Sequence, residues 1–143
     1  MLIDDLKFDL RLYVLLAGVN PLRAFLFKDG LVRLATEPYV KPTEDNIGNL
    51  FMHLTNYAIN KKNRLFQQND VAEDSEGDMQ DDGTHKRSYK SLVYTLKCMG
   101  KPYRKLKAGI DDLLVKTLIV AQPQLSHLYK TCQPDDLENQ LCF

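Results

Sequence analysis

The first 36 residues constrain the fold most strongly, because apolar runs alternate there with turn-forming pairs. Residues 10–18 and 23–28 are rich in aromatic and branched apolar side chains, and Asn20-Pro21 between them favours a turn. This pattern predicts two antiparallel strands joined by a short loop.

A third strand is predicted from the next turn signal. Asp29-Gly30 is a tight-turn pair, and residues 31–35 after it alternate between apolar and polar positions. The three strands would form an antiparallel meander in which successive side chains lie on opposite faces. Because of this alternation, Asp9 and Arg11 of the first strand are expected to project together.

Helical patterns follow in the second half of the chain. Ser88 is a suitable N-cap for a helix over 89–98, whose apolar residues recur at helical spacing. A longer helix is predicted over 104–121, and Pro123 either kinks it or opens a new turn that runs on to about Tyr129. Separate blocks of strands and helices predict an α+β fold, an antiparallel sheet flanked by helices.

Composition excludes several classes of protein. The chain has 143 residues, 44% of them apolar and 27% charged, which is the balance of one compact globular domain. Its three cysteines are widely spaced and lack a Cys-x-x-Cys pair, which argues against a disulfide framework and against a thiolate zinc site. No apolar run reaches the roughly 18 residues of a membrane span, and no signal peptide is visible. We therefore expect an intracellular protein with no membrane attachment.

Polar residues of the strands and of the segment 53–56 form the best candidate site. Lysine and arginine donate charged hydrogen bonds to phosphate oxygens, and aspartate can accept from a ribose hydroxyl or anchor an arginine. Such a set could hold a nucleoside triphosphate, whereas the simpler alternative is a solvated strand face. The sequence contains neither a P-loop nor a dinucleotide fingerprint. The candidate residues are Lys7, Asp9, Arg11, Arg33, His53, Leu54, Thr55 and Asn56. No role in the site is predicted for His85.

Several ordered blocks of the sequence resemble the tubulin tyrosine ligase-like family. A weaker match extends through residues 110–132 and Cys142-Phe143. The sequence of the block at residues 53–61 is more similar to the branch of the family that adds glutamate than to the branch that adds tyrosine. The strong blocks are Lys7-Phe8-Asp9-Leu10-Arg11-Leu12-Tyr13-Val14-Leu15, Pro21-Leu22-Arg23, Asp29-Gly30-Leu31-Val32-Arg33, Ala35-Thr36-Glu37-Pro38-Tyr39 and His53-Leu54-Thr55-Asn56-Tyr57-Ala58-Ile59-Asn60-Lys61.

The resemblance implies an ATP-grasp fold and an ATP-dependent ligase. Such an enzyme joins free glutamate to glutamate side chains in the C-terminal tails of tubulin, through an acyl phosphate. Its partners would be tubulin and microtubules, in the cytoplasm and cytoskeleton, with the cilium or basal body as a candidate location. By position in the matched blocks, Lys7 and Asp9 would contact the nucleotide, and Arg11 and Arg33 would clamp the terminal phosphate and the acyl phosphate. The residues that would line the ATP site are His53, Leu54, Thr55 and Asn56.

The resemblance also implies that residues 1–143 are part of a catalytic domain. The magnesium ligands of the family, an aspartate and a Glu-x-Asn motif, are expected after Phe143, and a further segment is expected before Leu2. The chain alone is therefore expected to be inactive. Asp5 occupies a position at which the family commonly has glycine.

The formal net charge of zero hides two opposite blocks. Residues 67–84 contain seven acidic residues and no lysine or arginine, which predicts a solvated, disordered insertion. Residues 86–107, called the basic stretch below, contain eight lysines and arginines and no acidic residue. A run of this kind is often just a solvated face. It could also attract a polyanion, either the acidic tubulin tail or, with less support, nucleic acid. The alternative function is thus a non-catalytic or degenerate relative that binds microtubules through the basic stretch.

Overall fold

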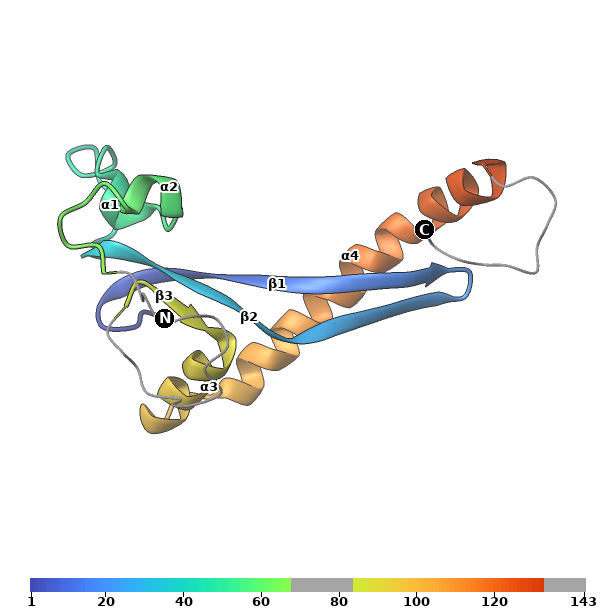
Figure 1. The fold of residues 1–143 in the computed structure, drawn as a ribbon, viewed down its shortest axis with the longest axis horizontal. Coiled ribbons are helices and arrows are strands. Elements are labelled where there is room, and N and C mark those ends of the chain that lie inside the picture. The colour runs from blue at the N-terminus through green and yellow to red at the C-terminus, as the bar shows by residue number, and fades with distance from the viewer. Residues whose placement is uncertain (68–83, 133–143) are drawn as a thin grey trace. The chain divides into compact units, whose positions relative to one another are not determined.

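A computed structural model of the protein describes residues 1–67 and 84–132. The strands form one sheet in the order β1-β2-β3, with β3 antiparallel to β2. The predicted α+β class, an antiparallel sheet with helices, is confirmed. Most of the predicted insertion lies outside the described residues, as do Cys142 and Phe143 of the weaker match. In chain order, the elements are β1 Leu6–Val19, β2 Leu22–Pro38, α1 Leu50–His53, α2 Tyr57–Asn60, β3 Lys86–Ser88, α3 Tyr89–Cys98 and α4 Tyr103–Cys132 (Figure 1).

The chain divides into two compact units. The first contains Met1–Leu12 and Asp29–Met99, and the second contains Tyr13–Lys28 and Gly100–Phe143. In the first unit, apolar side chains from the strands and from α3 form a buried core, which removes apolar surface from water and stabilises the sheet. The largest of these fully buried apolar side chains are Ile3, Val32, Leu34, Leu92 and Leu96.

The turn predicted at Asp29-Gly30 is wrong, because β2 is one continuous strand through both residues. A Cβ atom on Gly30 would lie 2.7 Å from the backbone oxygen of Arg11, so glycine permits the close approach of β2 to β1. The Asp29 carboxylate accepts a hydrogen bond from the backbone N–H of Lys90 (3.3 Å), in the first turn of α3. Gly30 therefore permits the contact between β1 and β2, and Asp29 caps α3. The third strand of the sheet is β3.

Helix α3 confirms the prediction for residues 89–98. The Ser88 hydroxyl accepts a hydrogen bond from the backbone N–H of Ser91 (3.0 Å), as an N-cap does. Gly100 follows the C-cap with a φ of 63°, the left-handed conformation that commonly ends a helix. Local signals at both ends thus set the length of this helix.

In the second unit, α4 is one helix that continues through Pro123. The amide of Gln122, next to this proline, donates a hydrogen bond to the backbone oxygen of Val19 (2.9 Å) and so links α4 to the hairpin. Apolar residues at helical spacing on α4 are half-buried, whereas Leu113 and Val120 are exposed. The half-buried residues are Leu106, Ile110, Leu114, Leu118 and Ala121. No helix among the described residues is long and apolar enough to cross a membrane.

A tight turn at Asp4-Asp5 leads into β1. Ile3 and Leu6 exchange two backbone hydrogen bonds across it (3.2 and 2.8 Å), and the two aspartates have positive φ values of 51° and 59°. Two-residue turns with this geometry favour glycine at the second position. Since the left-handed conformation strains a side chain, Asp5→Gly is expected to raise the free energy of unfolding by about 1 kcal/mol.

Denaturant unfolding of the purified chain measures this effect. The matched control is Asp4→Gly, which relieves similar strain but loses the ion pair between Asp4 and Arg87 (3.2 Å). It should gain less stability than Asp5→Gly. An Asp5→Gly variant that is no more stable than the wild type would contradict the prediction.

Candidate functional site

Charged side chains from adjacent strands meet on one face of the first unit. Arg33 on β2 forms a two-point ion pair with Asp9 on β1, in which Nε lies 2.9 Å from Oδ1 and Nη2 contacts Oδ2. This geometry fixes the plane of the guanidinium and leaves it partly exposed. Of the two uses predicted for Asp9, the structure shows the anchoring of an arginine.

Asn60 holds the segment between α1 and α2 against the sheet. Its side chain is buried, with 1% exposure. The amide oxygen accepts hydrogen bonds from the backbone N–H (3.1 Å) and the hydroxyl (2.8 Å) of Thr36 on β2. The amide nitrogen donates to the backbone oxygens of Leu54 (2.8 Å) and Asn56 (3.1 Å). All four hydrogen-bonding positions of the amide are therefore used, and the position of Thr55 is fixed relative to β2.

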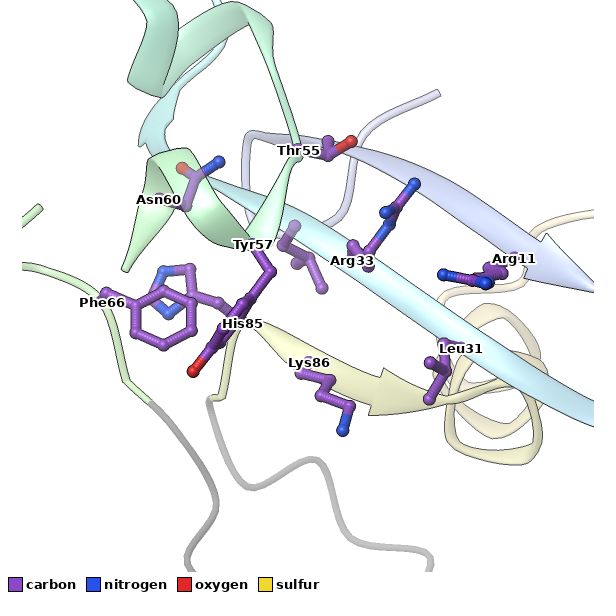
Figure 2. Close-up of a pocket in the computed structure, with 10 residues that line it drawn as sticks. Arg11, Leu31, Arg33, Thr55, Tyr57, Asn60, Phe66, His85 and Lys86 are labelled. Atoms are coloured by element: carbon purple, nitrogen blue, oxygen red, sulfur yellow. The ribbon is translucent and has the colours of Figure 1, made fainter. Parts of the chain in front are cut away.

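A cavity of about 240 Å³ lies over this face. Arg11, Leu31, Arg33 and Lys86 reach it from three neighbouring strands, and Figure 2 shows Thr55, Tyr57 and Asn60 entering from the α1-α2 segment. Three of its lining side chains are permanently cationic and none is acidic, which favours an anionic ligand. The full lining is Arg11, Leu31, Arg33, Leu34, Thr55, Tyr57, Asn60, Phe66, His85 and Lys86.

His85, for which the sequence predicts no role in the site, is buried in the cavity wall with 9% exposure. Its backbone oxygen accepts from the N–H of Leu34 (2.9 Å), and its Nδ1 accepts from the N–H of Gln67 (3.0 Å). Its ring stacks on Phe66, with centroids 5.6 Å apart. Burial is the main cause that lowers the pKa of His85, and the nearby charge of Arg87 adds to the lowering. The imidazole ring of His85 is therefore uncharged at physiological pH, and it forms part of the cavity wall.

Five of the eight predicted site residues lie outside the cavity lining, and three, Arg11, Arg33 and Thr55, line it. The Lys7 ammonium donates to the backbone oxygen of His53 (2.7 Å), so these two residues are neighbours. Nε2 of His53 lies 3.1 Å from the backbone oxygen of Asn46, while its Nδ1 is buried with no hydrogen-bond partner in the described part of the chain. Leu54 and Asn56 contribute their backbone oxygens to Asn60, and their side chains are exposed.

The cavity also contains residues that sequence reasoning did not assign to it. Tyr57 and Phe66 pack edge to face, with ring centroids 5.7 Å apart, and form an apolar wall. The sequence signal for Tyr57 was its place in the last strong block, and the signal for Lys86 was its place in the basic stretch. Nothing in the sequence pairs Phe66 with His85, because the acidic segment separates them.

Several positive charges of the basic stretch are close to carboxylates, which its sequence does not show. The buried Arg87 pairs with Asp4 (3.2 Å), Lys90 lies 3.9 Å from Asp29, and Lys107 pairs with Asp111 (2.6 Å). The stretch is also divided between the two units at Gly100. Its eight formal charges therefore do not act as one uncompensated patch.

Within residues 1–67 and 84–132, no group of three or more histidine, cysteine, aspartate or glutamate residues is placed to hold a metal ion. Cys98 and Cys132 are free and exposed thiols. The described residues therefore do not form a magnesium or zinc site of their own.

Comparison with known proteins identifies relatives for nearly the whole chain. The family model described as "Tubulin-tyrosine ligase family" matches residues 1–139. A Tetrahymena thermophila protein named "Probable beta-tubulin polyglutamylase" is 51% identical over 99% of this chain and 11% of its own length. Mouse "Tubulin polyglutamylase TTLL7" is 43% identical over 93% of the chain and 14% of its own length. Zebrafish "Tubulin polyglutamylase ttll6" is 39% identical over 99% of the chain and 17% of its own length.

The chain thus spans between 11% and 17% of the length of these relatives. The strong sequence blocks supply β1, β2 and the α1-α2 segment, the elements that carry Arg11, Arg33 and Thr55. The family model covers these residues together with the later helices, which extends the match beyond the strong blocks. The chain belongs to the tubulin-tyrosine ligase family.

Proposed function

We propose that this chain is part of an ATP-dependent ligase that adds glutamate to the side-chain carboxylates of glutamates in tubulin C-terminal tails. The observation that carries the proposal is the fixed Arg33–Asp9 pair at a cationic cavity. An arginine held by a carboxylate presents its remaining N–H groups in a set direction, as a binding site for phosphoryl or carboxylate oxygens requires. Relatives named as tubulin polyglutamylases support glutamate as the amino acid.

The proposed reaction has two steps. A carboxylate oxygen of the tubulin glutamate first attacks the terminal phosphorus of ATP, forming an acyl phosphate and releasing ADP. The amine of free glutamate then attacks the acyl carbon, the new C–N bond forms, and phosphate leaves as the amine loses a proton. Negative charge gathers on the phosphoryl oxygens in both steps. The guanidinium of Arg33, which Asp9 holds, would stabilise that charge without reorganising during the reaction, and Arg11 would add a second positive charge.

The predicted site residues other than the two arginines are suited to binding the nucleotide. Lys7 and His53 are neighbours through a 2.7 Å hydrogen bond, and Thr55 places a hydroxyl at the cavity. In the proposal these residues, together with Asp9, Leu54 and Asn56, hold ATP. A cavity of about 240 Å³ is smaller than the roughly 300–1,000 Å³ that encloses a drug-sized ligand, so it would take the reacting end of the nucleotide rather than all of it. ATP itself stays a prediction from the family resemblance.

Magnesium is the expected companion of ATP in such a reaction. The described residues hold no cluster of three or more metal-binding side chains. Magnesium ligands after Phe143 stay a prediction. Tubulin as substrate would place the protein on the cytoskeleton, and the cilium or basal body likewise stays a prediction.

An incorporation assay tests the proposed function. The natural protein that contains this chain is incubated with microtubules and labelled glutamate, glycine or tyrosine, with and without ATP. Label from glutamate alone, dependent on ATP and lost when the tubulin tails are removed, is expected. Microtubule cosedimentation without incorporation would instead favour the non-catalytic alternative and its basic stretch. Incorporation by the isolated 143-residue chain would contradict the expectation that it is inactive alone.

A further inference from the structure

Resting on the proposed function, we propose that Lys86 binds a carboxylate of the acidic substrate beside the Arg11 and Arg33 pair. This carboxylate belongs either to the free glutamate or to a glutamate of the tubulin tail, and the experiment below separates the two. Lys86 would thereby help the site to select an acidic side chain over a neutral one. Nothing in the matched sequence blocks assigns this residue a role.

Strand pairing places Lys86 on the same face as the arginine. The register sets Arg33 directly opposite Lys86, and residues that lie opposite each other in an antiparallel pair share a face of the sheet. Their Cβ atoms in such a pair are typically about 4.5–5.5 Å apart. Figure 2 shows Lys86 extending from β3 at the edge of the cavity, with its ammonium at the free end of the stem.

The neighbours of Lys86 fix its backbone. Arg87 turns to the opposite face, is buried, and donates to the backbone oxygen of Thr84 (2.9 Å) as well as pairing with Asp4. The Thr84 hydroxyl donates to the backbone oxygen of Lys86 (2.9 Å). Strand β3 is therefore held on both sides of Lys86, while the ammonium of Lys86 forms no ion pair within the described residues.

The charge of the lining favours an anion with more than one negative group. Arg11, Arg33 and Lys86 place three cationic side chains along the cavity, and Asp9 pairs with Arg33. If a phosphoryl group binds Arg11 and Arg33, Lys86 can bind a second anionic group, which in this reaction is a carboxylate.

The size and walls of the cavity fit a small acidic substrate. Its volume of about 240 Å³ is below the roughly 300–1,000 Å³ of a drug-sized ligand site, so the group that it takes must be small. Tyr57, Phe66 and the neutral His85 form an apolar wall along which a methylene chain can pack. Apolar surroundings also lower the local dielectric constant, so each charged contact becomes stronger than in water. A glutamate side chain combines the two properties, a short apolar stem and a terminal charge.

The test compares Lys86→Met, which keeps the stem and removes the charge, with Lys86→Arg, which restores the charge. The matched control is Lys97→Met, at an exposed lysine on α3 that does not line the cavity. In the natural protein, KM is measured separately for free glutamate and for a tubulin tail peptide. Lys86→Met is expected to raise one of the two KM values about tenfold or more, with a smaller change in kcat, and Lys86→Arg is expected to recover most of the loss.

A rise in KM for glutamate assigns the carboxylate to the free amino acid, and a rise in KM for the peptide assigns it to the acceptor. Unchanged values for both ligands would overturn the proposal. If the wild type incorporates no glutamate at all, the proposed function fails, and protection against thermal unfolding by glutamate or by a glutamate-rich peptide becomes the readout. Protection lost in Lys86→Met and kept in Lys97→Met then supports the site. Equal protection in both variants, or none in the wild type, overturns it.

Discussion

Replacing Arg33 with alanine is expected to lower ATP-dependent glutamate incorporation by about 10²- to 10³-fold, the usual effect of removing one fixed donor from a developing negative charge. The variant loses the group that Asp9 positions through two contacts, and it leaves the Asp9 carboxylate beside the cavity. An unpaired carboxylate would then repel the phosphoryl oxygens that the arginine attracted. The loss should therefore fall on kcat/KM, measured with labelled glutamate and microtubules.

Two further variants make this prediction specific. Arg33→Lys keeps the positive charge but cannot form the two-point contact with Asp9, so most of the activity should still be lost. Arg64→Ala removes an exposed arginine that does not line the cavity and should keep wild-type kcat/KM. Wild-type turnover in Arg33→Ala would refute the role assigned to this residue.

Asn60→Leu is expected to lower the free energy of unfolding by about 2–4 kcal/mol, because it leaves several buried polar groups without partners. The N–H and hydroxyl of Thr36 lose their acceptor, and the backbone oxygens of Leu54 and Asn56 lose a donor. Leucine branches at the same atom and is larger than asparagine, so the substitution opens no cavity, and the effect reports the lost hydrogen bonds together with any overpacking.

Chemical denaturation of the purified chain measures this loss. Asn56→Ala is the control, because its exposed side chain makes no cap hydrogen bond at the start of α2. It should change stability by less than about 0.5 kcal/mol. Equal stability of the two variants would show that the Asn60 network is not what holds the α1-α2 segment on the sheet.

Local signals predicted helix α3 well. The hydroxyl of Ser88 and the glycine at position 100 set the ends of α3, and both act through atoms within a few residues of the helix ends. The hairpin of β1 and β2 was predicted for the same reason, since Asn20-Pro21 and the flanking apolar runs lie close together in the sequence.

Long-range contacts explain the error at Asp29-Gly30. The pair has the composition of a turn, but the chain passes through it as an extended strand. The glycine is needed because β2 approaches the backbone of Arg11, and the aspartate caps a helix that begins at Tyr89. Neither contact has a signal in the neighbouring sequence.

The sequence by itself determined the family, the α+β class and three of the residues in the cavity, because ordered blocks and short-range patterns carry that information. The tertiary structure decided that Asp9 anchors Arg33, that His85 and Phe66 stack in one wall, and that Lys86 lies opposite Arg33. The physical reason is strand pairing and burial. Strand pairing and burial each bring together side chains that are far apart in the chain. The stability that such a contact adds depends on the partner rather than on the residue itself.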